Sequence, residues 1–338
     1  MTTSLVTGGA GFVGRHLVRS LLERGDTVYC VDSLVPLTGA LSPYFSKHET
    51  FKQGWPMFDP TDFERFHFIE LDCRDWFQQN PKFQVDYAFH LAAVVGGRMM
   101  IEHHPLAVAD DLSIDSAFWQ WAKNAQPKKS ICFSSSAAYP ISLQQQDNFK
   151  LLLEDDIDFN SSIGIPDMTY GWAKLTSEYL AKLAYEKHGI KSVCFRPFSG
   201  YGPDQDLAYP FPSICKRVLE NVGQNEIAVW GSGHQMRDFI HIRDCVEGIL
   251  TITDQIDDAS AVNLSTGIFT SFITLASMAA NVLGYHPKIY GMSDKPEGVF
   301  ARGGSTIRQN KLGFVAKTSL LDGVQECIEW FKKSIDNQ

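Results

Sequence analysis

Short runs of β-branched and apolar residues alternate with longer amphipathic stretches through the first 195 residues of the chain. Runs typical of buried strands lie at residues 4–7, 27–31, 66–71, 85–91, 130–134 and 192–195. Amphipathic helices are predicted at 13–24, ending at Gly25, around Trp119, and at 168–188, ending at Gly189. Strands that alternate with helices predict βαβ crossovers, and therefore a parallel sheet covered by helices on both faces.

The pattern is less regular beyond Pro197. Residues 200–212 and 287–304 show neither helical nor strand periodicity and are predicted to be irregular. Between them, residues 239–252 are predicted as a strand followed by a helix, and residues 261–264 as a further strand. Both segments are expected to rejoin the parallel sheet and helices predicted for the first half of the chain.

The composition is that of a globular chain, because 44% of the 338 residues are hydrophobic and 20% are charged. This excludes a disordered, collagen-like or disulfide-stapled protein. The formal net charge of −9 repels nucleic acid and anionic lipid, so we expect neither as a partner. A phosphate ligand would have to be met by Arg, Lys or backbone N–H groups placed locally.

Cysteine spacing and hydropathy bear on the cellular compartment. The seven cysteines form no CxxC pair and no Cys/His run at zinc spacing, so we expect reduced thiols and no metal site. No apolar run approaches the roughly 20 residues of a membrane helix. The first predicted strand also begins too early to leave room for a signal peptide. These features favour a soluble, cytoplasmic protein.

A glycine-rich turn joins the first predicted strand to the first helix. Residues 7–14 are TGGAGFVG, and Gly8, Gly11 and Gly14 permit a tight turn and the close approach of a pyrophosphate to the helix N-terminus. Asp32 ends the second strand 18 residues after Gly14, where a carboxylate can accept from ribose hydroxyls. Because a carboxylate repels a 2′-phosphate, NAD is favoured over NADP. The alternative is that Asp32 is a turn residue.

Further polar side chains follow the ends of other strands. Asp72 follows the third strand, at the sheet edge where such folds bind ligands. It either accepts from an adenine amino group or is a solvated turn residue. Ser134, Ser135 and Ser136 follow the fifth strand at the same edge. One of these hydroxyls can hydrogen-bond a reacting oxygen, unless the run is only a serine-rich turn.

Tyr170 and Lys174 lie four residues apart and therefore on one face of a predicted helix. A tyrosine with a pKa of about 10 is a poor base at neutral pH. A neighbouring ammonium and a nicotinamide cation would both favour the phenolate. Such a pair occurs by chance on many helices, but behind a dinucleotide-binding turn it indicates a general base.

Taken in order, these segments resemble the extended short-chain dehydrogenase/reductases, and more narrowly the NAD-dependent nucleotide-sugar epimerase/dehydratase family. The motifs are TGGAGFVG with Asp32, LDCRD (71–75), HLAA (90–93), FSSSAAYP (133–140), YGWAK (170–174), RPFSGYGP (196–203) and MRDFIHIRDCVEGI (236–249). They span nearly the whole chain. VVGGRMM (94–100) and PEGVFARGGSTIRQNKLGF (296–314) are similar to the branch of the GDP-mannose 3,5-epimerases and GDP-fucose synthases.

The resemblance implies roles for residues at matching positions. Ser135 matches the hydroxyl that binds the reacting oxygen of the sugar, Tyr170 the general base, and Lys174 its ribose-bound partner. Arg237 matches a contact to the substrate diphosphate, and Arg302 is a weaker match to a second one or else a surface residue. The implied cofactor contacts are Gly8, Gly11, Phe12, Val13, Asp32, Asp72, Leu91, Ala92, Ala93, Ser134, Tyr170 and Lys174, and the implied substrate contacts are Gly96, Gly97, Ser135, Ser136, Arg237 and Arg302.

The chain departs from that branch at positions that would move protons. Ala137 stands where the branch has Cys and the 4,6-dehydratases have Glu, and alanine cannot transfer a proton. Residues 204–206 are DQD where the fucose synthases have a catalytic His, and 111–112 are Asp-Leu where an active-site Asn is usual. His103, His104, His234 and His241 remain as possible acids, although a lone histidine is more often packed or solvated.

We therefore predict a Rossmann-type α/β fold, with a doubly wound parallel sheet and an NAD-binding domain at 1–196 that residues 236–266 rejoin. A smaller C-terminal substrate-binding domain is expected at 197–235 and 267–338, with the active site in the cleft between the domains. The Trp172, Leu175, Tyr179 and Leu183 side chains form an apolar stripe. Because relatives commonly dimerise through this helix, the resemblance implies a homodimer, unless the stripe only covers the sheet.

The predicted activity is NAD-dependent epimerisation of a nucleoside-diphosphate sugar through a transient keto sugar, at carbon 4. This chemistry requires Ser135, Tyr170 and Lys174 but no further acid, so it tolerates Ala137. The alternatives are an NAD-dependent nucleotide-sugar dehydratase, a 3,5-epimerase or a net oxidoreductase. An alternative of another class is a non-catalytic NAD-binding scaffold.

Overall fold

The computed structural model describes residues 2–35, 64–94, 98–295 and 297–336. The chain forms two compact units, the first comprising residues 1–138, 167–196 and 249–262, and the second comprising residues 139–166, 197–248 and 263–338. Helix α8 (Ile242–Ile252) and strand β14 (Asp258–Leu264) run across this division. By their contacts, residues 139–166 and 236–248 therefore belong to the second unit.

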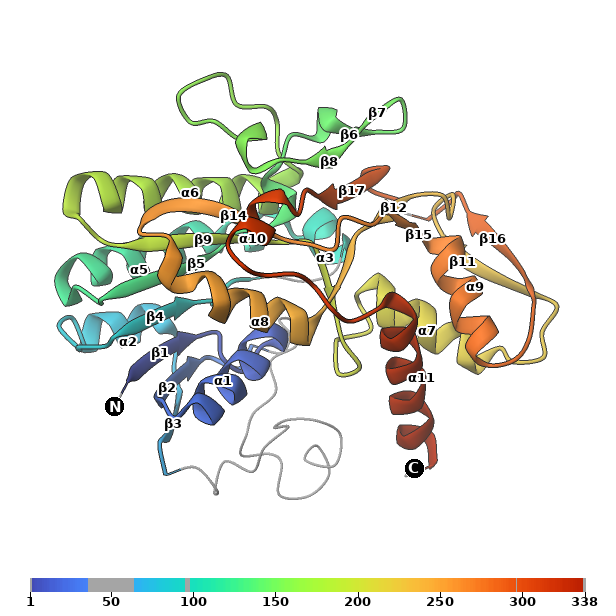
Figure 1. Ribbon diagram of the computed structural model, residues 1–338, viewed down its shortest axis with the longest axis horizontal. Coiled ribbons are helices and arrows are strands. Elements are labelled where there is room, and N and C mark those ends of the chain that lie inside the picture. The colour runs from blue at the N-terminus through green and yellow to red at the C-terminus, as the bar shows by residue number, and fades with distance from the viewer. Residues whose placement is uncertain (1, 36–63, 95–97, 296, 337–338) are drawn as a thin grey trace. The chain divides into compact units, whose positions relative to one another are not determined.

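A seven-stranded sheet forms the centre of the first unit (Figure 1), with the strand order β14-β9-β5-β4-β1-β2-β3. The strands besides β14 are β1 (Thr3–Thr7), β2 (Thr27–Asp32), β3 (Phe66–Glu70), β4 (Tyr87–His90), β5 (Lys129–Phe133) and β9 (Ser192–Pro197). Each neighbouring pair from β9 to β3 is parallel. This sheet confirms the predicted Rossmann-type α/β fold.

Helices cover both faces of this sheet (Figure 1). On one face α5 packs between α2 and α6, and α1 lies on the other face. Their bounds are α1 (Phe12–Arg24), α2 (Cys73–Gln79), α5 (Asp110–Ala125) and α6 (Met168–His188), and the short helices α3 (Arg98–His103) and α4 (Pro105–Val108) precede α5. Gly25 and Gly189 end α1 and α6 in the left-handed conformation, with φ of 97° and 67°, which glycine adopts without a steric penalty.

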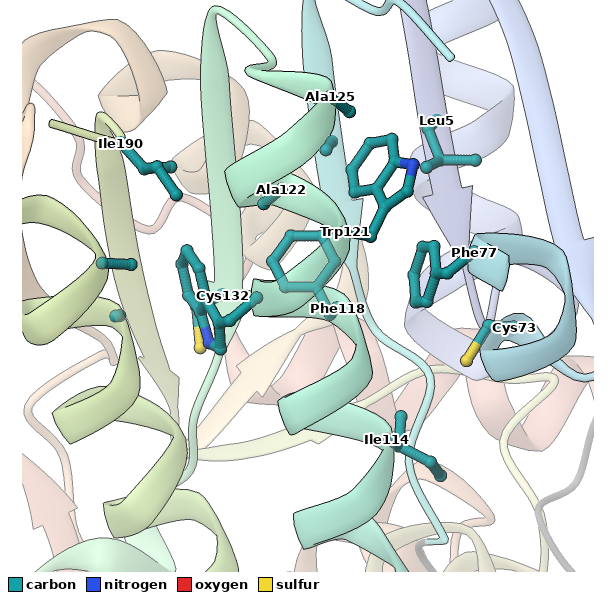
Figure 2. Close-up of a cluster of buried hydrophobic side chains, with 14 of the residues drawn as sticks. Leu5, Cys73, Phe77, Ile114, Phe118, Trp121, Ala122, Ala125, Cys132 and Ile190 are labelled. Atoms are coloured by element: carbon teal, nitrogen blue, oxygen red, sulfur yellow. The ribbon is translucent and has the colours of Figure 1, made fainter. Parts of the chain in front are cut away.

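An aromatic core fixes α2 and α5 against the sheet (Figure 2). Phe77 of α2 stacks on Trp121 of α5, with ring centroids 5.3 Å apart. One turn earlier, Phe118 stacks on His90 at the end of β4, with centroids 4.2 Å apart. Stacked rings combine apolar burial with a defined geometry, so α5 is held in one orientation against the face of the sheet.

The second unit combines short strands with a cluster of three helices, α7 (Pro210–Glu220), α9 (Phe272–Val282) and α11 (Leu320–Asp336). Their facing residues Phe211, Cys215, Leu275, Val324 and Cys327 are buried together. The remaining elements are β6 (Gln144–Gln145), β7 (Asn148–Phe149), β8 (Leu151–Leu152), β10 (Ser199–Tyr201), β11 (Glu226–Trp230), β12 (Met236–Arg237), β13 (Phe239–His241), β15 (Thr270–Ser271), β16 (Lys288–Met292), β17 (Ala301–Gly304) and α10 (Ile307–Lys311).

The prediction that residues 287–304 are irregular is wrong for two segments. Strand β16 pairs in parallel with β11, and β17 pairs in parallel with both β12 and β8. Likewise β10, at the start of the segment 200–212, pairs in parallel with β13. These strands are short and find their partners far along the chain, so local periodicity does not reveal them.

The seven cysteines are all free and buried. Within the residues that the structure describes, no helix is both long enough and apolar enough to cross a membrane.

Candidate active site

The loops after β1 and β4 diverge at the carboxyl edge of the seven-stranded sheet. The two strands are parallel neighbours, but the chain continues from β1 toward β2 on one side and from β4 toward β5 on the other. An open α/β sheet binds its ligand at such a switch point.

At two positions of the glycine-rich turn after β1, neighbouring backbone atoms leave no room for a side chain. A Cβ atom on Gly8, which has φ of +69°, would lie 2.6 Å from the Ala92 nitrogen, and one on Gly14 would lie 2.3 Å from the Gly8 carbonyl oxygen. Gly11 caps α1 without a side-chain hydrogen bond. The N–H groups of the first turn, where Phe12 and Val13 lie, therefore have no side-chain cap, which suits an anion such as a pyrophosphate.

Asp32 is fixed at the end of β2 beside this turn. Its Oδ2 atom accepts from the Ala10 N–H (2.9 Å) and its Oδ1 atom from the Leu34 N–H (2.8 Å). Burial raises the pKa of this carboxyl above its ordinary value, and the two backbone donors partly oppose that shift. Each carboxylate oxygen keeps acceptor capacity for a ribose hydroxyl. The turn and Asp32 thus fit the diphosphate and the ribose of a dinucleotide.

The other residues expected at the cofactor lie near the same edge. Leu91, Ala92 and Ala93 follow β4, and the Leu91 N–H donates to the Thr7 carbonyl (3.0 Å), which holds this segment against the glycine-rich turn. Asp72 caps α2 by accepting from the Arg74 N–H (2.8 Å) and pairs with the Arg74 guanidinium (2.7 Å). These bonds with Arg74 lower the pKa of Asp72. The adenine contact of Asp72 stays a prediction.

Tyr170 and Lys174 share one face of α6, as their spacing predicts. The Lys174 ammonium lies 5.6 Å from the centre of the Tyr170 ring. Burial raises the pKa of the Tyr170 phenol above its ordinary value, and the charge of Lys174 and a hydrogen bond with Ser135 only partly oppose this rise. Ser135 follows β5, so the structure brings together the three residues expected to be catalytic.

The carboxylates of Asp111 and Asp115 on α5 raise the pKa of Lys174. The Lys174 Nζ atom lies 3.6 Å from Asp111 Oδ2, and all three side chains are buried. Burial lowers the pKa of Lys174, but the two carboxylates outweigh it and raise that pKa above its ordinary value. Lys174 therefore remains a cation at neutral pH.

The sequence alone did not indicate that Asp111 and Asp115 belong to this site. Asp111 was notable only as a departure from an expected Asn. The available signal was that two carboxylates, four residues apart, lie on the same helical face as Ile114 and Phe118, which are buried apolar residues. Carboxylates on a buried face require partners.

The serines after β5 differ in what they contact. The Ser134 hydroxyl donates to Glu178 of α6. The Ser135 hydroxyl accepts from the Ala137 N–H (3.1 Å) and also contacts Tyr170. Ser136 and Ala137 are buried in the 3₁₀ turn Ser136–Ala138. The side chain at position 137 therefore offers no proton.

The two arginines expected at the substrate diphosphate lie side by side in the second unit. Arg237 of β12 and Arg302 of β17 are directly paired across the two strands. The Arg237 guanidinium donates to the carbonyls of Met236 (2.8 Å) and Val299 (3.0 Å), and Arg302 Nε donates to Gln144 (2.7 Å). Both arginines therefore make contacts within this unit.

Other candidates lie elsewhere or cannot be placed. Gly96 and Gly97 lie outside the described residues. His241 is buried 3.4 Å from Glu326 in the second unit. His103, His104 and His234 are exposed.

Comparison with known proteins identifies relatives along the whole chain. Residues 4–265 match the model of the NAD dependent epimerase/dehydratase family. GDP-mannose 3,5-epimerase 1 of Oryza sativa subsp. indica is 26% identical, with 98% of this chain and 82% of that protein covered. The protein named uncharacterized UDP-glucose epimerase YtcB of Bacillus subtilis is 28% identical, with 95% of each chain covered.

The fold is also that of a solved epimerase. The structure of UDP-glucose 4-epimerase from Thermotoga maritima with UDP-glucose has a TM-score of 0.78 at 24% identity, covering 99% of this chain and 100% of that one. The family match confirms the predicted family together with its cofactor, NAD.

Proposed function

The chain belongs to the NAD-dependent epimerase/dehydratase family, and we propose that it is an epimerase of nucleoside-diphosphate sugars that acts at carbon 4. The observation that carries this proposal is the Ser135–Tyr170–Lys174 cluster beside the buried Ala137. The cluster can move one proton at one sugar oxygen. No side chain at position 137 can move a second proton at a neighbouring carbon.

The chain's own residues supply the acid–base chemistry of this proposal. Tyr170 removes the proton of the carbon-4 hydroxyl, and Ser135 hydrogen-bonds the same oxygen. Lys174 keeps its charge and favours the phenolate form of Tyr170. When bound, NAD supplies the hydride chemistry, accepting a hydride from the sugar and returning it. After the keto sugar presents its opposite face, Tyr170 gives its proton back.

The diphosphate of the substrate requires local positive charge, because the net charge of the chain is −9. We assign this contact to Arg237, which is paired with Arg302 across β12 and β17. A planar guanidinium can hold two phosphate oxygens at once. Ser136, Gly96 and Gly97 are proposed to lie beside the sugar, as the resemblance implies.

The experiment that tests this function is turnover in deuterated water. A panel of nucleotide sugars is first screened by thermal shift, because a bound ligand raises apparent stability. We expect conversion of the stabilising sugar to its carbon-4 epimer, with no deuterium on carbon, since the hydride leaves and returns within the site. Deuterium at a carbon beside the oxidised centre would contradict the proposal and favour a 3,5-epimerase or a dehydratase.

Two further outcomes separate the remaining alternatives. Accumulation of NADH in proportion to the sugar consumed would identify a net oxidoreductase. Binding of NAD without conversion of any sugar in the panel would favour a non-catalytic scaffold.

We expect the protein to bind NAD at least tenfold more tightly than NADP, or about 1.4 kcal/mol. The Asp32 carboxylate, fixed by the Ala10 and Leu34 N–H groups, would accept from the ribose hydroxyls and repel a 2′-phosphate. Asp32→Ala should narrow this difference. The measurement is titration calorimetry with both cofactors.

Asp72→Ala is the matched control, because an adenine contact is common to NAD and NADP and its loss should weaken both equally. Equal affinities in the unmutated protein would refute the assigned role of Asp32.

We also propose a homodimer and a cytoplasmic location. On α6, Leu175 is buried, but Trp172 and Tyr179 are 50% and 43% exposed. These two aromatic side chains lie seven residues apart, and thus on one helical face that a second copy could cover. Light scattering at micromolar concentration tests the homodimer, and the mass of a monomer would contradict it.

A further inference from the structure

Lys174 lies in a buried ion cluster with an excess of negative charge. Asp111, Asp115 and Lys174 are 1%, 3% and 4% exposed. Asp115 Oδ1 lies 3.2 Å from the Nε2 atom of His90. Burial lowers the pKa of His90, so this ring is neutral at pH 7. Two carboxylates therefore face a single ammonium.

Asp111 is held in a fixed position within this cluster. Its Oδ1 atom accepts from the Val94 N–H at 2.5 Å, and its Oδ2 atom faces Lys174 at 3.6 Å. The same carboxylate thus joins the segment after β4 to the helix that carries Tyr170. Water is largely excluded here, so charges act on one another more strongly than at the surface.

We propose that Asp111 is a positioning residue, whose carboxylate holds the Lys174 ammonium in place and offsets part of the ammonium's charge at Tyr170. The inference rests on the function proposed above for Tyr170. An ammonium with no counterion would favour the phenolate most strongly, but its burial would be costly. Asp111 keeps Lys174 protonated. Its negative charge also weakens the effect by which Lys174 lowers the pKa of the Tyr170 phenol.

The other groups that face this pair are few among the described residues. Helix α5 contributes Asp115 besides Asp111, and β4 contributes His90. Strand β5 and the loop after it contribute Cys132 and Ser135. Helix α3, which also packs on α6, carries Glu102 and His103. All of these remain in place when Asp111 alone is changed.

Asp111→Asn separates charge from position. The amide has the shape of the carboxylate, and its oxygen can still accept from the Val94 N–H. The negative charge is lost, and the amide NH2 group, which can only donate, replaces the Oδ2 atom opposite the Lys174 ammonium. Because that charge repels a phenolate and compensates the ammonium, its removal should lower the pKa of Tyr170, provided that Lys174 stays protonated beside Asp115.

The experiment titrates Tyr170 in the free protein by the ultraviolet absorbance of its phenolate, with the Tyr170→Phe variant subtracted in each background. Asp111→Asn should lower the midpoint by about 1 pH unit, the lower end of the effect of one close charge. Asp110→Asn is the matched control, because it removes the same charge from the adjacent, exposed residue of α5. That variant should leave the midpoint unchanged.

An unchanged or raised midpoint in Asp111→Asn, or no phenolate before the protein unfolds, would overturn the proposal. Asp115→Asn gives a second test if Asp111→Asn fails to fold, and should lower the midpoint by a smaller amount. The titration requires neither cofactor nor sugar. A shift without epimerase activity would therefore refute the proposed function alone, whereas activity without a shift would refute this inference alone.

Discussion

Tyr170→Phe is expected to lower turnover of the nucleotide sugar by at least about 100-fold, the lower range for the loss of a general base. The variant keeps the ring beside Lys174 and removes the hydroxyl that contacts Ser135. Substrate binding should change little, because the diphosphate is assigned to Arg237 in the second unit. The loss should therefore appear in kcat rather than in KM.

Tyr185→Phe is the matched control for this prediction. Tyr185 lies on the same helix, but its side chain is exposed. The turnover of the Tyr185→Phe variant should therefore equal that of the unmutated protein. Both variants are compared by thermal unfolding to verify the fold. If Tyr170→Phe retained more than about a tenth of the activity, Tyr170 would not be the essential base.

The first half of the fold could be predicted because its signals are local. Each long helix and each strand of the seven-stranded sheet has its own periodicity, and Gly25 and Gly189 end the two helices that they were expected to end. The second unit depends on pairing between distant segments. Arg237 and Arg302 pair across β12 and β17, yet β12 has only two residues and no period to detect.

In the candidate site, too, features set by local spacing could be predicted from the sequence, and contacts between distant segments could not. The glycine-rich turn, Asp32 and the Tyr170–Lys174 pair were visible because their residues lie at fixed local spacings. The contact of Asp111 with Lys174 was not, because it depends on how α5 packs against α6. The sequence shows two carboxylates on an apolar face but not the cation that they meet.

Glu178→Ala is expected to cost about 3–5 kcal/mol of stability, the range for removing one partner of a buried ion pair. Glu178 of α6 accepts from Arg196 Nε (2.8 Å) and Nη2 (2.6 Å), and both side chains are almost fully buried. Its Oε1 atom also accepts from Ser134. The pair thus fastens α6, one turn beyond Lys174, to β9 and to the loop that carries Ser135. Without Glu178, the guanidinium remains buried and loses the carboxylate with which it forms two hydrogen bonds.

Urea unfolding followed by tryptophan fluorescence measures this loss, because Trp76, Trp119 and Trp121 lie in the core of the same unit. Glu186→Ala on the exposed end of α6 is the matched control and should change stability by less than about 0.5 kcal/mol. The double variant Glu178→Ala/Arg196→Met removes both charges, so it should recover part of the loss. If Glu178→Ala were as stable as Glu186→Ala, the ion pair would not hold α6 in place, and the position of Tyr170 would have to depend on the other contacts of α6, such as that of Lys174 with Asp111.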